Sequence, residues 1–124
     1  MTKFKVLGEY IANNYSGKVV EVGVGSYYEV AEYLKRRGFK VITVDISPKR
    51  EETVKDDVLN PRMEIYEGAS LIYSIRPPYE IQESIIKLAE KIGCDAIIVP
   101  LKSEIIEGGK LTTYRGVSFY VFRR

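Results

Sequence analysis

Residues 19–27 have the sequence VVEVGVGSY, in which a run of β-branched residues stops at two glycines. Because β-branched residues favour strands and glycines end them, a buried strand over 18–22 is predicted to enter a tight turn. Helical spacing of apolar residues then continues through Val30 and Leu34 up to Gly38. A strand, a glycine turn and a helix in this order are typical of a nucleotide-cofactor loop.

The flanking segments extend this unit to a complete α/β domain. Apolar periodicity predicts helices over 4–15 and 79–92, strands over 40–45, 56–59, 69–75 and 95–101, and a hairpin of 111–114 with 117–122. A helix between two strands implies a parallel pair with a right-handed crossover. We expect a Rossmann-like α/β fold, with a mostly parallel twisted sheet, helices on both faces and a C-terminal antiparallel hairpin.

Length and composition bound the kind of protein. A chain of 124 residues fits a single domain over 1–124. Its 19 basic and 17 acidic residues are mixed, so no broad basic face for nucleic acid is indicated. The single cysteine, Cys94, fits a reducing compartment, and no apolar run approaches the roughly 20 residues of a membrane span. We therefore expect a cytoplasmic protein without a membrane anchor. The Lys-, Glu- and Ile-rich composition resembles that of heat-adapted proteins.

The glycine turn and the next strand carry the candidate cofactor residues. Gly23 allows a sharp turn, and Gly25 allows a ligand to approach the backbone. Asp45 ends the next strand, 22 positions after Gly23, which is near the spacing at which an acid meets ribose hydroxyls. Asp57 with Val58 follows on the third predicted strand, where an acid would accept the amine of adenine. Asp56 is equally placed for that role.

Other nucleotide cofactors fit this turn less well. Tyr28 occupies the third glycine position of a dinucleotide fingerprint, which disfavours NAD and FAD. Ser26 and Glu29 have the spacing of a capping box, which would use the helix amides that a phosphate needs. The chain has no histidine, so a metal site is not expected. In the plainest alternative, Gly23, Gly25 and Asp45 merely form tight turns.

The segment 19–26 resembles the first motif of class I methyltransferases that use S-adenosylmethionine, including the acid two residues before the first glycine. The resemblance implies that this cofactor binds here. It implies that Gly23 and Gly25 line the methionine part, that Ser26 completes the motif and that Glu21 supports the loop. It also implies that Asp45 holds the ribose and that Asp57 with Val58 contacts the adenine.

A closer resemblance rests on chain size and on the segments EVGVG at 21–25, DISP at 45–48 and YSIRPP at 73–78. Together they are similar to a small uncharacterised archaeal protein family with a methyltransferase-like fold and no assigned reaction. The chain departs from methyltransferases in two ways. First, Tyr27 replaces their third loop glycine, and its ring would either stack near the cofactor or only pack at the start of the helix. Second, their substrate-binding segments are missing. Enzyme status is therefore left open.

Arg76, Pro77, Pro78 and Tyr79 follow a predicted strand and should lie at the carboxyl edge of the sheet, where open α/β folds bind ligands. They resemble the Asn/Asp/Ser-Pro-Pro-Tyr/Phe motif of methyltransferases that act on planar amino groups. A guanidinium donates hydrogen bonds and accepts none, so Arg76 favours a carboxylate or phosphate, and Tyr79 would stack on a planar group. The alternative is that Arg76 pairs with Glu80 or another surface acid and the prolines only end the strand.

Three functions agree with these patterns. The first is an S-adenosylmethionine-binding protein, in its fullest form a methyltransferase acting on a small or anionic acceptor. The second is a non-catalytic module that binds a nucleoside cofactor or has a regulatory role. The third is a nucleic-acid-associated protein that uses Arg76 and nearby cations. Helical cover looks incomplete for seven strands, so we also expect a homodimer.

Overall fold

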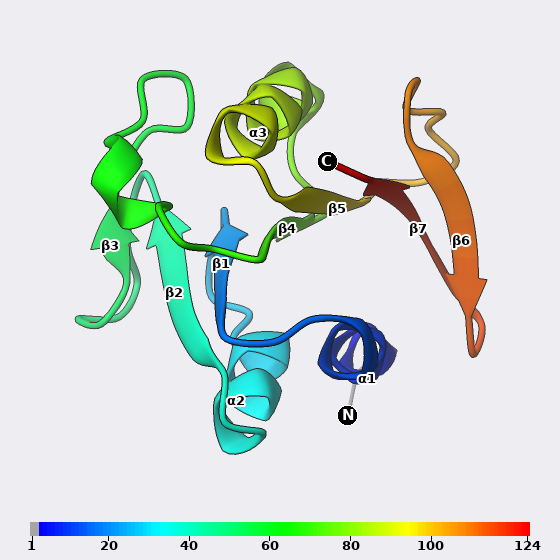
Figure 1. The fold of residues 1–124 in the computed structure, drawn as a ribbon, viewed down its shortest axis with the longest axis horizontal. Helices are drawn as coiled ribbons and strands as arrows, with labels where there is room; N and C mark the ends of the chain where they lie inside the picture. Colours follow the sequence, from blue (N-terminus) through cyan, green and yellow to red (C-terminus); the bar gives the residue numbers. More distant parts are fainter. Residues whose placement is uncertain (1–2) are drawn as a thin grey trace.

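Seven strands form one sheet in the computed structural model, which describes residues 3–124 (Figure 1). In sheet order they are β3 (Val54–Lys55), β2 (Lys40–Asp45), β1 (Lys18–Val22), β4 (Leu71–Ile75), β5 (Asp95–Val99), β7 (Val117–Phe122) and β6 (Lys110–Tyr114). The first five of these run parallel, and β7 runs antiparallel to both of its neighbours, β5 and β6. The predicted Rossmann-like fold with its C-terminal hairpin is confirmed.

The strand order reverses beside β1. The chain runs outward from β1 through β2 to β3, and then returns to β4 on the other side of β1. Connections that leave in opposite directions open a crevice at the carboxyl ends of the strands, and this is where open α/β sheets bind ligands. The turn after β1 and the turn after β4 both lie at this crevice.

Helices cover both faces of the sheet (Figure 1). Helices α1 (Lys5–Asn14) and α2 (Glu29–Arg36) pack on one face, where Leu7, Ile11 and Leu34 are fully buried. Helix α3 (Tyr79–Ile92) and the short 3-10 helix η1 (Met63–Ile65) pack on the other. Strands enclosed on both sides are mainly apolar, which explains the apolar runs 71–73 in β4 and 96–99 in β5.

Two local predictions are wrong. The third strand is Val54–Lys55 and does not cover 56–59, because Asp57 turns the chain: its Oδ1 accepts a hydrogen bond from the amide of Leu59 at 2.9 Å. The capping box is not formed either. Helix α2 begins after Tyr28, and Glu29 accepts a hydrogen bond from the hydroxyl of Tyr27 at 3.0 Å.

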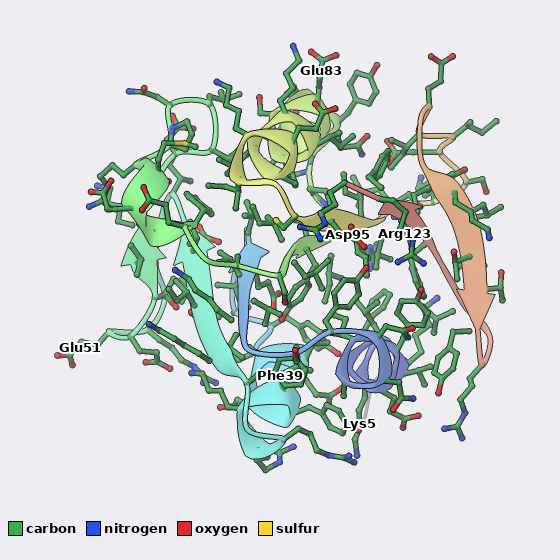
Figure 2. All side chains as sticks on the ribbon, in the orientation of Figure 1. Lys5, Phe39, Glu51, Glu83, Asp95 and Arg123 are labelled. Carbon is green, nitrogen blue, oxygen red and sulfur yellow. The ribbon has the colours of Figure 1, made fainter. Side chains whose placement is uncertain are left out.

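A polar cluster fixes the amino end of β5 (Figure 2). Asp95 accepts hydrogen bonds from the Tyr15 hydroxyl at 2.6 Å, from the Arg123 guanidinium at 3.2 Å and from the amide of Arg124 at 3.0 Å. Burial and the neighbouring carboxylate raise the pKa of Tyr15, so it stays a donor. This cluster joins the end of α1 to the C-terminus, at the edge of the sheet opposite the crevice.

Gly8 sets the approach of α1 to α2. A Cβ at this position would lie 2.8 Å from Cδ2 of Tyr33. We expect Gly8→Ala to lower the free energy of unfolding by about 1–3 kcal/mol, although alanine is the better helix former. Urea unfolding measures this loss. In a Tyr33→Leu background the loss should disappear, and an equal loss in both backgrounds would contradict the clash.

Candidate functional site

The turn after β1 is built from two glycines in the left-handed region. Gly23 has a φ of +71° and donates its amide to the carbonyl of Val44 at 2.8 Å, so the turn lies against the end of β2. Gly25 has a φ of +58°, and its amide donates to Oδ2 of Asp45 at 2.7 Å. Only glycine adopts these angles without strain, so both are needed for this turn.

Asp45 keeps acceptor capacity while it holds the turn. Its Oδ2 accepts from Gly25, and its Oδ1 accepts from the amide of Ser47 at 2.9 Å. Each carboxylate oxygen offers two lone pairs, so each has one left for a ligand donor. The side chain is half-buried at the carboxyl edge of β2. This arrangement fits a pair of ribose hydroxyls.

A hollow of about 280 Å³ lies beside Asp45 on the α3 side of the sheet; we call it the β2 hollow. Its walls are mainly apolar, with three carboxylates among them: Val22, Gly23, Val44, Asp45, Ile46, Asp56, Asp57, Val58, Pro78 and Ile81. Ile46 is 63% exposed although it is a large apolar residue. Apolar walls with a few polar groups suit a flat heteroaromatic base.

The structure separates the two adjacent acids. Asp56 is buried, and its Oδ2 accepts a hydrogen bond from the Tyr66 hydroxyl at 2.7 Å. Its Oδ1 accepts from the backbone amide and from Nε of Arg62, both at 3.2 Å. Asp57 is half-buried, and among the described residues its side chain accepts only from the amide of Leu59. Both oxygens of Asp56 are therefore used by hydrogen bonds within the fold, whereas Asp57 has an oxygen that could accept from a ligand.

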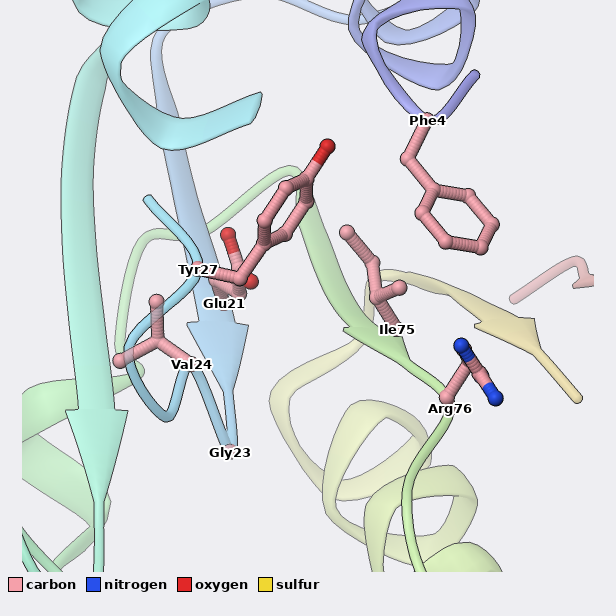
Figure 3. A pocket seen from close by; sticks show the side chains of 7 residues that line it. All are labelled: Phe4, Glu21, Gly23, Val24, Tyr27, Ile75 and Arg76. Atoms are coloured by element: carbon pink, nitrogen blue, oxygen red, sulfur yellow. The ribbon is translucent and has the colours of Figure 1, made fainter. Parts of the chain in front are cut away.

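A second hollow, of about 350 Å³, opens on the α1 and α2 side between the ends of β1 and β4 (Figure 3); we call it the β4 hollow. It is lined by Phe4, Glu21, Gly23, Val24, Tyr27, Ile75 and Arg76. The rings of Phe4 and Tyr27 meet edge to face with centroids 6.2 Å apart. Gly23 lines both hollows, so a ligand that fills both must pass over this glycine.

Glu21 lies at the base of the β4 hollow and is only 1% exposed. It accepts a hydrogen bond from the hydroxyl of Tyr73, its neighbour on β4, at 2.8 Å. Burial raises the pKa of Glu21 to about 8, and the hydrogen bond from Tyr73 offsets this only in part. A cationic group placed beside Glu21 would favour the charged form of this carboxyl and lower its pKa.

Arg76 lies at the opposite wall of the β4 hollow (Figure 3). Its φ of +57° is unusual for a residue with a side chain, and its amide donates to the carbonyl of Val99 at 2.7 Å. Within residues 3–124 its guanidinium makes no hydrogen bond or ion pair, so the alternative pairing with Glu80 is not formed.

The four residues that follow β4, 76–79, do not line one common hollow. Arg76 lines the β4 hollow, Pro77 is buried, and Pro78 lines the β2 hollow. Tyr79 is 73% exposed and borders a separate groove along α3. Tyr79 is therefore not in the hollow that holds Arg76. Of the residues of the glycine motif, Gly25 and Ser26 line neither hollow.

Several lining residues were not predicted from the sequence. They are Phe4, Val24, Ile46, Ile75 and Ile81. In the sequence they are ordinary apolar positions of helices, strands or turns. Ile46 offers the only local clue, since a large apolar residue directly after a polar strand end is expected to pack against something.

Comparison with known proteins assigns the family. An uncharacterised protein family, UPF0146, matches residues 4–124. The chain belongs to this family. A UPF0146 protein of the archaeon Archaeoglobus fulgidus is 46% identical over 122 residues, which cover 95% of this chain and 93% of that protein. The expected archaeal family is thus confirmed.

Solved structures of methyltransferases share the UPF0146 fold. An S-adenosyl-L-methionine methyl transferase from Silicibacter pomeroyi has a TM-score of 0.59 at 15% identity, with 96% of this chain and 88% of that chain covered. The antibiotic-resistance methyltransferase Kmr has a TM-score of 0.64 at 12% identity, with 99% and 93% covered. At these identities the likeness shows the fold alone.

None of the helices within residues 3–124 is long and apolar enough to cross a membrane.

Proposed function

We propose that this UPF0146 protein binds S-adenosylmethionine, with the nucleoside in the β2 hollow and the methionine part in the β4 hollow. The observation that carries the proposal is that the two hollows meet at Gly23 and differ in character. One offers Asp45 and Asp57 among apolar walls, and the other offers a buried carboxyl and a free guanidinium. An extended ligand with a nucleoside at one end and an amino acid at the other fits this pair.

The site suits this cofactor better than a dinucleotide. The ring of Tyr28 is buried at the third glycine position of a dinucleotide fingerprint, and its hydroxyl is 2.7 Å from Oγ1 of Thr53. This side chain fills the space through which the helix end would approach a pyrophosphate. Tyr27 and Phe4 instead give the β4 hollow an aromatic wall, which suits a sulfonium cation.

Methyl transfer is the reaction that such a site would support. The bound cofactor supplies an electrophilic methyl group, and the chain's residues hold it and exclude water. The acceptor would be small or anionic and would enter at the mouth of the β4 hollow. Within this proposal the protein is cytoplasmic and forms a homodimer.

A non-catalytic role as a cofactor-binding module is the second candidate. The segment between β5 and β6 contains no helix, so the chain offers little surface of its own for recognising an acceptor. Binding tests serve both candidates, because each requires the cofactor. The third candidate, association with nucleic acid through Arg76, would require binding that weakens steeply with salt.

Calorimetric titration tests the proposed site. The wild type should bind S-adenosylmethionine and S-adenosylhomocysteine, and it should not bind NAD or ATP. Asp45→Asn should weaken both affinities by about 100-fold, since charge-assisted hydrogen bonds to two hydroxyls are lost. Glu107→Gln, an exposed acid outside both hollows, is the matched control. Failure of the wild type to bind either nucleoside at millimolar concentration would sink the proposal.

A further inference from the structure

The β4 hollow places an acidic and a basic side chain on separate walls. Glu21 comes from the end of β1 and Arg76 from the end of β4. The two side chains form no ion pair with each other: the carboxyl of Glu21 takes its hydrogen bond from Tyr73, and the guanidinium is free within residues 3–124. Apolar side chains of Val24, Ile75 and Phe4 lie around them. A zwitterion on an aliphatic chain has this same pattern.

The backbone holds Arg76 in place at some cost. A residue with a side chain is disfavoured in the left-handed region, because its Cβ crowds the backbone. The hydrogen bond to Val99, which lies beside Ile75 in the next strand, fixes that conformation, and the buried Pro77 fixes the chain beyond it. Strain of this kind is characteristic of residues positioned for a ligand.

We propose that Arg76 binds the α-carboxylate, and Glu21 the α-ammonium, of the amino-acid end of the cofactor. The inference rests on the proposed function. It gives Arg76 a role in holding the cofactor in place of the acceptor-binding role expected from the sequence. A guanidinium offers two parallel donors that match a carboxylate, and the Glu21 carboxylate accepts from an ammonium. The protein should therefore select for ligands that keep both amino-acid groups.

Four nucleosides separate the two contacts. S-adenosylmethionine and S-adenosylhomocysteine keep both groups, decarboxylated S-adenosylmethionine keeps only the ammonium, and 5′-methylthioadenosine has neither. At pH 8 the wild type should bind S-adenosylmethionine about 10- to 100-fold more tightly than its decarboxylated form. Arg76→Gln should remove this difference and leave the affinities for the decarboxylated form and for 5′-methylthioadenosine unchanged.

Two further variants complete the test. Glu21→Gln should weaken binding of S-adenosylmethionine and of its decarboxylated form by similar factors and leave 5′-methylthioadenosine unaffected. Lys102→Gln is the matched control, since Lys102 is an exposed cation that follows β5, also has a positive φ, and lies outside the hollow. It should change none of the four affinities.

The outcomes distinguish the two proposals. If the wild type binds all four nucleosides with equal affinity, or if Arg76→Gln weakens all four equally, the carboxylate contact is wrong while the nucleoside site stands. If Arg76→Gln leaves S-adenosylmethionine binding intact, Arg76 serves another ligand and the inference fails. Absence of binding to all four would overturn the proposed function and this inference together.

Discussion

Glu21→Gln is expected to make the protein more stable than the wild type above pH 8, by about 5 kcal/mol. Burial raises the pKa of Glu21 from an ordinary value of 4.5 to about 8, so the folded state holds a proton that the unfolded state releases. This contribution to stability is fully present below pH 4.5 and is lost as the pH rises to 8. Each pKa unit corresponds to about 1.4 kcal/mol, which gives the magnitude.

Glutamine is a fair replacement for the protonated carboxyl. It has nearly the same volume, and its carbonyl accepts the hydrogen bond from Tyr73. Wild type and variant should therefore unfold alike near pH 5 and diverge as the wild-type carboxyl is forced to ionise. Within residues 3–124, Tyr73 is the only side chain hydrogen-bonded to Glu21, and the cation of Arg76 lies across the hollow.

Urea unfolding from pH 5 to pH 9.5 measures the effect. Glu51→Gln serves as the control, because Glu51 is an exposed acid in the turn between β2 and β3. Its difference from the wild type should stay small and constant with pH. A constant difference for Glu21→Gln as well would mean that Glu21 ionises as an ordinary surface acid does.

A ligand that carries an ammonium should offset the free-energy cost of ionising Glu21. A ligand ammonium placed beside the carboxyl would favour its charged form and recover the stability lost above pH 5. Sites that are destabilising without their ligand are common where function requires a desolvated charge. Saturating S-adenosylhomocysteine should therefore stabilise the wild type more than Glu21→Gln.

The β1–turn–α2–β2 unit could be predicted from the sequence because its signals are local. Alternating and helical periodicity, together with Gly23, Gly25 and Gly38, fix the type of each element. The third strand could not, since β3 has only two residues and the adjacent acids turn the chain through side-chain hydrogen bonds. Apolar periodicity over so short a segment does not distinguish a strand from a turn.

The acids that line the two hollows were singled out from the sequence as candidates, but their distribution between two hollows was not predicted. Phe4 reaches the β4 hollow only because α1 docks on α2 through Gly8, a contact between segments far apart in sequence. Pro78 and Tyr79 are adjacent in the chain, yet they line different depressions, because the start of α3 turns successive side chains in different directions. Such directions depend on the packing of whole elements.

Asp56 and Asp57 provide a matched pair that separates fold from function. Asp56→Asn should lower the free energy of unfolding by about 2–4 kcal/mol, because a buried, charge-assisted hydrogen bond from Tyr66 and the contacts with Arg62 are weakened. Asp57→Asn should cost less than about 1 kcal/mol, since this carboxylate holds only the local turn at a half-buried site.

For ligand affinity, the larger loss should come from Asp57→Asn and the smaller from Asp56→Asn. With 5′-methylthioadenosine as the ligand, Asp57→Asn should weaken binding about tenfold, since a carboxylate that accepts from the adenine amine is replaced by a neutral amide. Asp56→Asn should leave the affinity of the folded protein nearly unchanged. Urea unfolding and calorimetric titration of both variants give the four numbers. If Asp56→Asn abolishes binding at unchanged stability, the roles are exchanged, and the ligand must displace Tyr66 or Arg62 to reach its acceptor.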